Sequence, residues 1–122
     1  VWKAYLPSLY AGAKPADFDQ YRDAVVTKLR DPAYGRAFSQ TTRQTDHAVA
    51  EARLAEVTAP TLVVMGERDP DFSNPTEEAA WIGSTLQAEV TMVPDAGHYP
   101  QSQQPELTAT AIIGFLGRTH HA

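Results

Sequence analysis

Two short apolar runs decide the fold, and each ends in a turn that carries an ionisable side chain. They read Ala59-Pro-Thr-Leu-Val-Val-Met-Gly-Glu-Arg-Asp-Pro70 and Glu89-Val-Thr-Met-Val-Pro-Asp-Ala-Gly-His-Tyr-Pro100. Continuous apolar runs rich in branched residues are typical of strands that are covered on both faces, as in a parallel sheet. We therefore expect strands at 61–65 and 90–93.

The residues between the two runs predict a helix over 76–87. Asn74 or Thr76 is the expected N-cap, and Glu77 and Glu78 stand in the first turn, where carboxylates favour the helix dipole. A strand, a helix and a strand in this order form a βαβ unit, whose strands are parallel and joined by a right-handed crossover. The predicted fold class is therefore α/β.

The segment before the first run is predicted to be entirely helical, with helices over 1–10, 16–30, 32–43 and 48–57. Pro7 should interrupt the first helix, Asp31-Pro32 should end the second, and Asp46 should cap the last. Apolar residues spaced by three or four form one face of the second helix: Phe18, Tyr21, Val25 and Leu29. The change of class near Pro60 divides the chain into a helical part, 1–57, and a βαβ part, 58–122.

A last helix is expected over 107–116, after the second apolar run. Gly117 is predicted to end it, because glycine is common just past helix C-termini. Its expected buried stripe contains five apolar residues: Leu107, Ala111, Ile112, Phe115 and Leu116.

Composition excludes several classes of function. The chain has 122 residues, 43% of them hydrophobic and 20% charged, which is typical of one globular domain. A net charge of −5 argues against nucleic-acid binding, which needs a basic face. Nothing resembles a signal peptide or a membrane helix, so we expect a cytoplasmic protein without a membrane partner. There is no cysteine, no glycine-rich phosphate loop and no His/carboxylate cluster with metal-ligand spacing, so we expect neither a cofactor nor a metal ion.

Asp69 and His98 are the candidate catalytic residues. Ligands of open parallel sheets bind outside the carboxyl ends of the strands, and both residues lie just past such ends. A carboxylate that accepts a hydrogen bond from one imidazole nitrogen fixes the tautomer and stabilises the imidazolium, which leaves the other nitrogen free as a general base. The two turns therefore predict an acid–base pair.

Other assignments of these turns stay open. Asp71 is a rival to Asp69 as the acid, whereas Asp95 would have to fold back within its own turn. Asp-Pro pairs are common in turns, and a histidine in a loop is often only a surface residue. His47 is expected on a solvated helix face.

Residues 59–117 resemble the C-terminal end of alpha/beta-hydrolases. The stretch from Pro60 to Asp69 is similar to the strand and turn that hold the acid of that family's triad, and the stretch from Val90 to His98 is similar to the last strand and histidine loop. Pro105-Glu106 opens what resembles the last helix, and residues 1–57 resemble the end of a helical cap. The resemblance implies that Asp69 is the acid, that His98 is the base, and that the substrate is a small molecule with an ester or similar bond. It also implies that cap residues line the substrate pocket: Trp2, Tyr5, Leu6 and Tyr10.

The nucleophile of that family is absent from this sequence. The Gly-x-Ser-x-Gly elbow does not occur, and none of the serines at 8, 39, 73, 84 and 102 lies between suitably spaced glycines. We therefore expect a C-terminal fragment that does not turn over substrate alone and that depends on a Ser, Asp or Cys outside this chain. The start at Val1, without an initiator Met, is in keeping with an excised piece.

A non-catalytic reading is the alternative. Two strands leave a sheet edge unpaired, and an unpaired edge invites association. Either a missing N-terminal half or a second copy of the chain would cover this edge. In the second case the chain would be a self-associating helical and βαβ interaction module.

Overall fold

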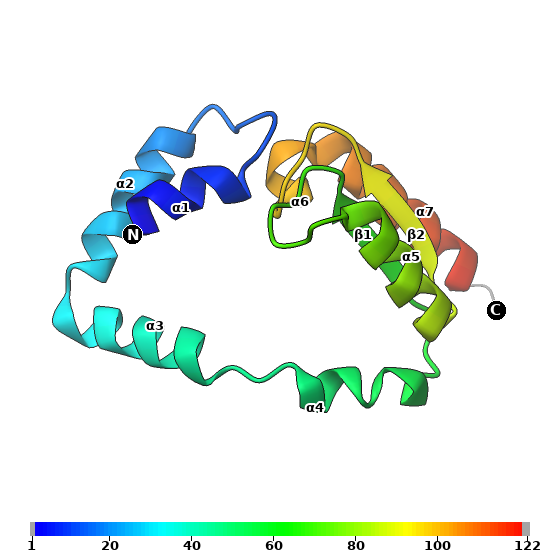
Figure 1. The fold of residues 1–122 in the computed structure, drawn as a ribbon. Coiled ribbons are helices and arrows are strands. Elements are labelled where there is room, and N and C mark those ends of the chain that lie inside the picture. Colours follow the sequence, from blue (N-terminus) through cyan, green and yellow to red (C-terminus); the bar gives the residue numbers. More distant parts are fainter. Residues whose placement is uncertain (1, 121–122) are drawn as a thin grey trace.

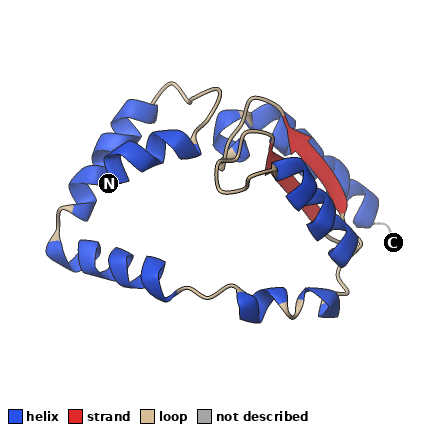
Figure 2. Cartoon of the chain, viewed as in Figure 1, coloured by secondary structure: helices blue, strands red, loops and turns tan. Residues whose placement is uncertain are grey.

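The computed structural model describes residues 2–120, so that Val1, His121 and Ala122 lie outside the described residues. Within 2–120 the chain forms seven α-helices and two parallel strands in a β-α-β arrangement, which confirms the α/β class (Figure 1, Figure 2). The elements are α1 Trp2–Leu9, α2 Phe18–Leu29, α3 Pro32–Gln44, α4 Ala48–Glu51, a 3-10 helix Leu54–Glu56, β1 Leu62–Gly66, α5 Pro75–Leu86, β2 Glu89–Val93, α6 Pro100–Gln103 and α7 Pro105–Thr119.

The βαβ unit forms the predicted parallel sheet. β1 and β2 pair in parallel, with Met65 opposite Met92 and Gly66 opposite Val93. Helices α5 and α7 contact both strands, α5 in front of them and α7 behind them in Figure 1. Asn74, and not Thr76, caps α5, because its side chain accepts a hydrogen bond from the Glu77 N–H. The predicted strands are correct to within one residue at each end.

The segment before β1 is helical, as predicted. Its four α-helices form an arch between the βαβ unit's two ends (Figure 1): the arch starts beside the loop of residues 94–99, called here the histidine loop because it carries His98, and it ends at β1. A buried cluster holds the beginning of the arch together: Leu6, Leu9, Tyr10 and Phe18. Pro7 does not interrupt α1, contrary to the prediction. The burial of Leu6 and Leu9 on either side of it offsets the single backbone hydrogen bond that a proline removes from so short a helix.

The second half of the arch is less regular than predicted. Asp31 caps α3 by accepting from the Ala33 N–H, and Pro32 takes the first helical position. The continuous helix expected over 48–57 is wrong, because α4 ends at Glu51 and is followed by the separate 3-10 helix. Almost every side chain in this stretch is exposed, and short helices without packing partners are marginal in water.

Helix α7 is longer and less buried than predicted. It begins at Pro105 and continues through Gly117 to Thr119, since one glycine costs a helix only about 1 kcal/mol. The predicted buried stripe is wrong, because Leu107, Ile112 and Leu116 are 50%, 40% and 55% exposed and Ala111 and Phe115 are only half-buried. Two strands are too narrow a sheet to cover this helix face. None of the helices in residues 2–120 is long and apolar enough to span a membrane.

Candidate active site

The turns that follow β1 and β2 contact each other directly through their backbones. The Glu67 N–H donates to the Val93 carbonyl over 2.9 Å, and the Arg68 N–H donates to the Ala96 carbonyl over 2.9 Å. Parallel strands end on the same side of a sheet, so these bonds extend the strand pairing into the turns. The two turns are thereby joined just before Asp69 and His98.

The structure brings the two predicted residues into hydrogen-bond contact. His98 Nδ1 lies 2.9 Å from Asp69 Oδ2, and the other Asp69 oxygen accepts from the Asp71 N–H over 3.0 Å. Asp69 is only 5% exposed, whereas the His98 side chain is 37% exposed. An ionised carboxylate can only accept, so Nδ1 carries the proton in this contact. That tautomer leaves Nε2 free to accept a proton.

Asp71, the rival acid, also faces the imidazole. Its Oδ2 lies 3.4 Å from His98 Nδ1, while its Oδ1 accepts a 2.5 Å hydrogen bond from the Tyr5 hydroxyl of α1. This hydrogen bond to Asp71 raises the pKa of Tyr5, with smaller contributions from burial and from the Asp71 charge. Asp69 is the nearer and more buried partner of His98, and Asp71 connects the pair to the first helix.

The other acidic residues of the turns do not reach the histidine contact. Asp95 pairs with Arg68 at 3.1 Å on the surface, where an ion pair contributes little to stability. Glu67 is exposed.

A cavity of about 550 Å³ opens beside this pair. It is lined by His98 and Asp71 together with Phe72 and His47. His47 is exposed, as predicted, but it stands at the start of α4 in the connection from α3 and also lines this cavity. None of the cap residues predicted to line the substrate pocket lines this cavity. Leu6 and Tyr10 lie in the buried helical cluster, and Tyr10 also lines a separate cavity of about 320 Å³.

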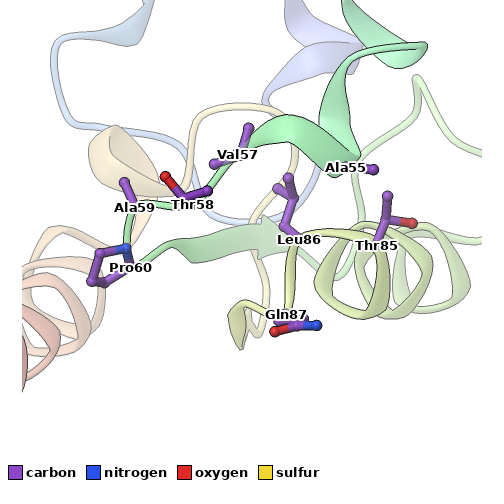
Figure 3. Close-up of a pocket in the computed structure, with 8 residues that line it drawn as sticks. All are labelled: Ala55, Val57, Thr58, Ala59, Pro60, Thr85, Leu86 and Gln87. Carbon is purple, nitrogen blue, oxygen red and sulfur yellow. The ribbon is translucent and has the colours of Figure 1, made fainter.

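A second cavity, of about 420 Å³, lies at the amino end of β1 and is lined by Ala55, Val57, Thr58, Ala59, Pro60, Thr85, Leu86 and Gln87. Figure 3 shows that these side chains come from the passage before β1 and from the end of α5. None of them is ionisable. Because a five-residue strand separates this cavity from the turn of Asp69, it takes no part in the acid–base pair.

Sequence reasoning missed two residues near the pair. No pattern in the sequence places His47 at the cavity, because its position there depends on how the whole arch folds. Gln103 is 7% exposed and hydrogen-bonds to the backbone beside His98. Gln103 belongs to a helix of only four residues, which is too short for a periodic pattern that would predict which of its side chains is buried.

Asp69, Asp71 and His98 are also the residues that could hold a metal ion, since one potential ligand atom from each lies within 4.8 Å of the others. This cluster corrects the expectation that no histidine and carboxylates come together at metal-ligand distance. Its atoms already hydrogen-bond to one another, to the backbone and to Tyr5.

Comparisons with known proteins add no relative: no family model, no curated protein and no solved structure matches this chain. The chain's own geometry therefore carries the functional argument.

Proposed function

We propose that this chain is the C-terminal part of an alpha/beta-hydrolase and supplies the acid and the base of a catalytic triad. One observation carries the proposal: the buried Asp69 carboxylate holds His98 Nδ1 at 2.9 Å, at the carboxyl ends of two parallel strands. The nucleophile would come from a polypeptide segment outside these 122 residues. By this proposal residues 1–57 are the end of a helical cap, and residues 58–122 are the end of the core.

The pair would act as general base and then as general acid. His98 Nε2 accepts the proton of a serine or cysteine nucleophile as it attacks the ester carbonyl, and returns this proton to the alkoxide that leaves. Nε2 then takes a proton from the water that attacks the acyl-enzyme, and gives it to the nucleophile's oxygen or sulfur as the acyl group leaves. With an aspartate nucleophile, His98 would serve only the second step. In each case Asp69 stabilises the imidazolium through Nδ1.

We place the substrate in the cavity of about 550 Å³ beside His98. It has the volume of an ordinary small-molecule site, and Phe72 gives it an apolar wall. His47 lies on the wall contributed by the arch and would contact the part of the substrate away from the reacting bond.

The test is hydrolysis of 4-nitrophenyl esters by this chain alone and by this chain together with the polypeptide encoded directly upstream of Val1. The chain alone should be inactive, and the combination should be active only while His98 is present. Activity of the chain alone that His98→Ala abolishes would contradict an external nucleophile. Activity of the combination that survives His98→Ala would contradict the role of the pair.

A second candidate function is self-association without catalysis. It is favoured by the exposed apolar side chains of α7, of which Leu107, Ile113 and Leu116 are each at least half exposed, next to a sheet of two strands. Sedimentation of the isolated chain distinguishes the two. A monomer at high concentration would count against this candidate, and a defined oligomer without ester hydrolysis in any combination would favour it.

A further inference from the structure

Gln103 is a buried polar side chain whose amide oxygen and amide nitrogen both make hydrogen bonds. Its Oε1 accepts from the Gly97 N–H over 2.9 Å, and its Nε2 donates to the carbonyls of Ala11 over 2.9 Å and Ala13 over 2.6 Å. Gly97 directly precedes His98, whereas Ala11 and Ala13 belong to the connection between α1 and α2. One side chain thus joins the histidine loop to the helical arch.

Two backbone hydrogen bonds join the same two segments. The His98 N–H donates to the Leu9 carbonyl over 2.7 Å, and the Ala13 N–H donates to the Asp95 carbonyl over 3.1 Å. Leu9 is the last residue of α1, and its carbonyl is one of the groups that a helix leaves without an internal partner. The end of α1 and the histidine loop therefore satisfy each other's backbone groups.

The contact is too close to tolerate a side chain at Gly97. A Cβ there would lie 2.4 Å from the Leu9 carbonyl oxygen and 2.9 Å from the Ala11 nitrogen. The loop is consequently held against the arch on one side and by Gln103 of α6 on the other.

We infer that Gln103 is a positioning residue for His98. It fixes the Gly97 peptide, and with it the imidazole, relative to the turn after α1. The inference rests on the proposed function for the role of His98 as base. Gln103 touches neither the imidazole nor the cavity residues in any hydrogen bond, and it acts only through the backbone of the loop.

Only a side chain with both donors and an acceptor can make these three bonds. Glutamate at 103 keeps an acceptor for the Gly97 N–H but loses both donors. Methionine keeps the approximate volume and loses all three bonds, which leaves one N–H and two carbonyls without this partner. Comparison of the two variants therefore separates the effect of the hydrogen bond to Gly97 from the effect of the hydrogen bonds to Ala11 and Ala13.

The experiment uses ¹⁵N NMR of the His98 ring in the full chain, which reports the nitrogen that carries the proton. The variants are Gln103→Met and Gln103→Glu. Gln101→Met is the matched control, since Gln101 is exposed in the same short helix. Wild type and the control should show the Nδ1–H tautomer, and Gln103→Met should show a mixture of both tautomers with far-UV circular dichroism unchanged.

Gln103→Glu should retain more of the Nδ1–H tautomer than Gln103→Met does, because it keeps the bond to Gly97. If the methionine variant does not fold, the glutamate variant decides, and its expected result is a partial mixture of tautomers. A wild-type tautomer in a folded Gln103→Met or Gln103→Glu chain would overturn the inference. Unfolding of both variants would also overturn it, because it would assign Gln103 to folding.

The NMR result does not depend on turnover, so its failure can be told apart from a failure of the proposed function. In an active combination with the upstream polypeptide, Gln103→Met should lower kcat about 10²-fold, as expected for a catalytic group displaced by about 1 Å, with little change in KM. An equal loss in Gln101→Met, or a change in KM alone, would contradict a positioning role.

Discussion

The carbonyl oxygen of Gly97 lies so close to Gly66 that a Cβ on Gly66 would come within 2.0 Å of it. Gly66 is the last residue of β1, and Gly97 immediately precedes His98. The close approach of these two backbones is what allows the turn of Asp69 and the loop of His98 to meet.

Substitution of this glycine should therefore destabilise the fold. Gly66→Ala places a methyl group against backbone atoms of the histidine loop, and overpacking of this kind costs about 1–3 kcal/mol. Gly117→Ala is the control: it lies within α7 with no atom within 4 Å of the added Cβ, and should stabilise the helix by up to about 1 kcal/mol. Urea unfolding measures both, and equal effects of the two substitutions would contradict the close approach.

Asp69 and Asp71 should differ strongly as partners of His98. In an active combination with a nucleophile, Asp69→Asn should reduce kcat by roughly 10⁴-fold, because the amide favours the wrong tautomer. Asp71→Asn should cause a much smaller loss, since its carboxylate is farther from Nδ1 and more exposed. Steady-state kinetics of the two variants provide the check, and the reverse order would identify Asp71 as the acid.

The hydrogen bond between Tyr5 and Asp71 should be visible in the titration of Tyr5. This bond is the largest cause that raises the pKa of Tyr5 above its ordinary value of 10.0, so Asp71→Asn should lower that pKa towards 10.0. The Tyr5 ring signals in an NMR titration of the full chain measure the change. An unaltered pKa in the variant would show that Asp71 is not tied to α1.

Stability should fall in alkaline solution because of two stacked tyrosines. Burial raises the pKa values of Tyr10 and Tyr99, whose ring centroids lie 4.8 Å apart, above the ordinary value of 10.0. A raised pKa in the folded state favours the neutral form, so this contribution is complete below pH 10 and is lost as the pH rises through the raised values. Chemical unfolding from pH 8 upward should show the decline, and Tyr99→Phe should make it shallower. The same decline in Tyr99→Phe would exclude Tyr99 as a cause.

The sequence predicts the βαβ unit well because its signals are local. Branched apolar runs specify β1 and β2, and the helix between them is predicted to within one residue at each end, with Asn74 as one of its two candidate N-caps. Strand polarity then places Asp69 and His98 on one edge of the sheet before any coordinate is known, and the structure shows the contact at 2.9 Å. Their catalytic role remains a prediction.

The features that the sequence does not reveal depend on distant contacts. Gln103 bonds to residues about ninety positions away, and no pattern within its own helix indicates this. Gly117 fails as a helix end because one glycine costs a helix only about 1 kcal/mol. Leu107 and Leu116 fail as buried residues because nothing in the two-stranded sheet covers them. Periodicity gives the apolar side of a helix and leaves open whether anything covers it.

The ¹⁵N spectrum of the His98 ring in the full chain, compared with that of Asp69→Asn, tests the acid–base pair most directly. Wild-type His98 in its neutral form should carry its proton on Nδ1, where Asp69 accepts the hydrogen bond, and Asp69→Asn should move the proton to Nε2. A wild-type imidazole protonated mainly on Nε2, or one whose tautomer does not respond to Asp69→Asn, would contradict the claim that these two residues form an acid–base pair.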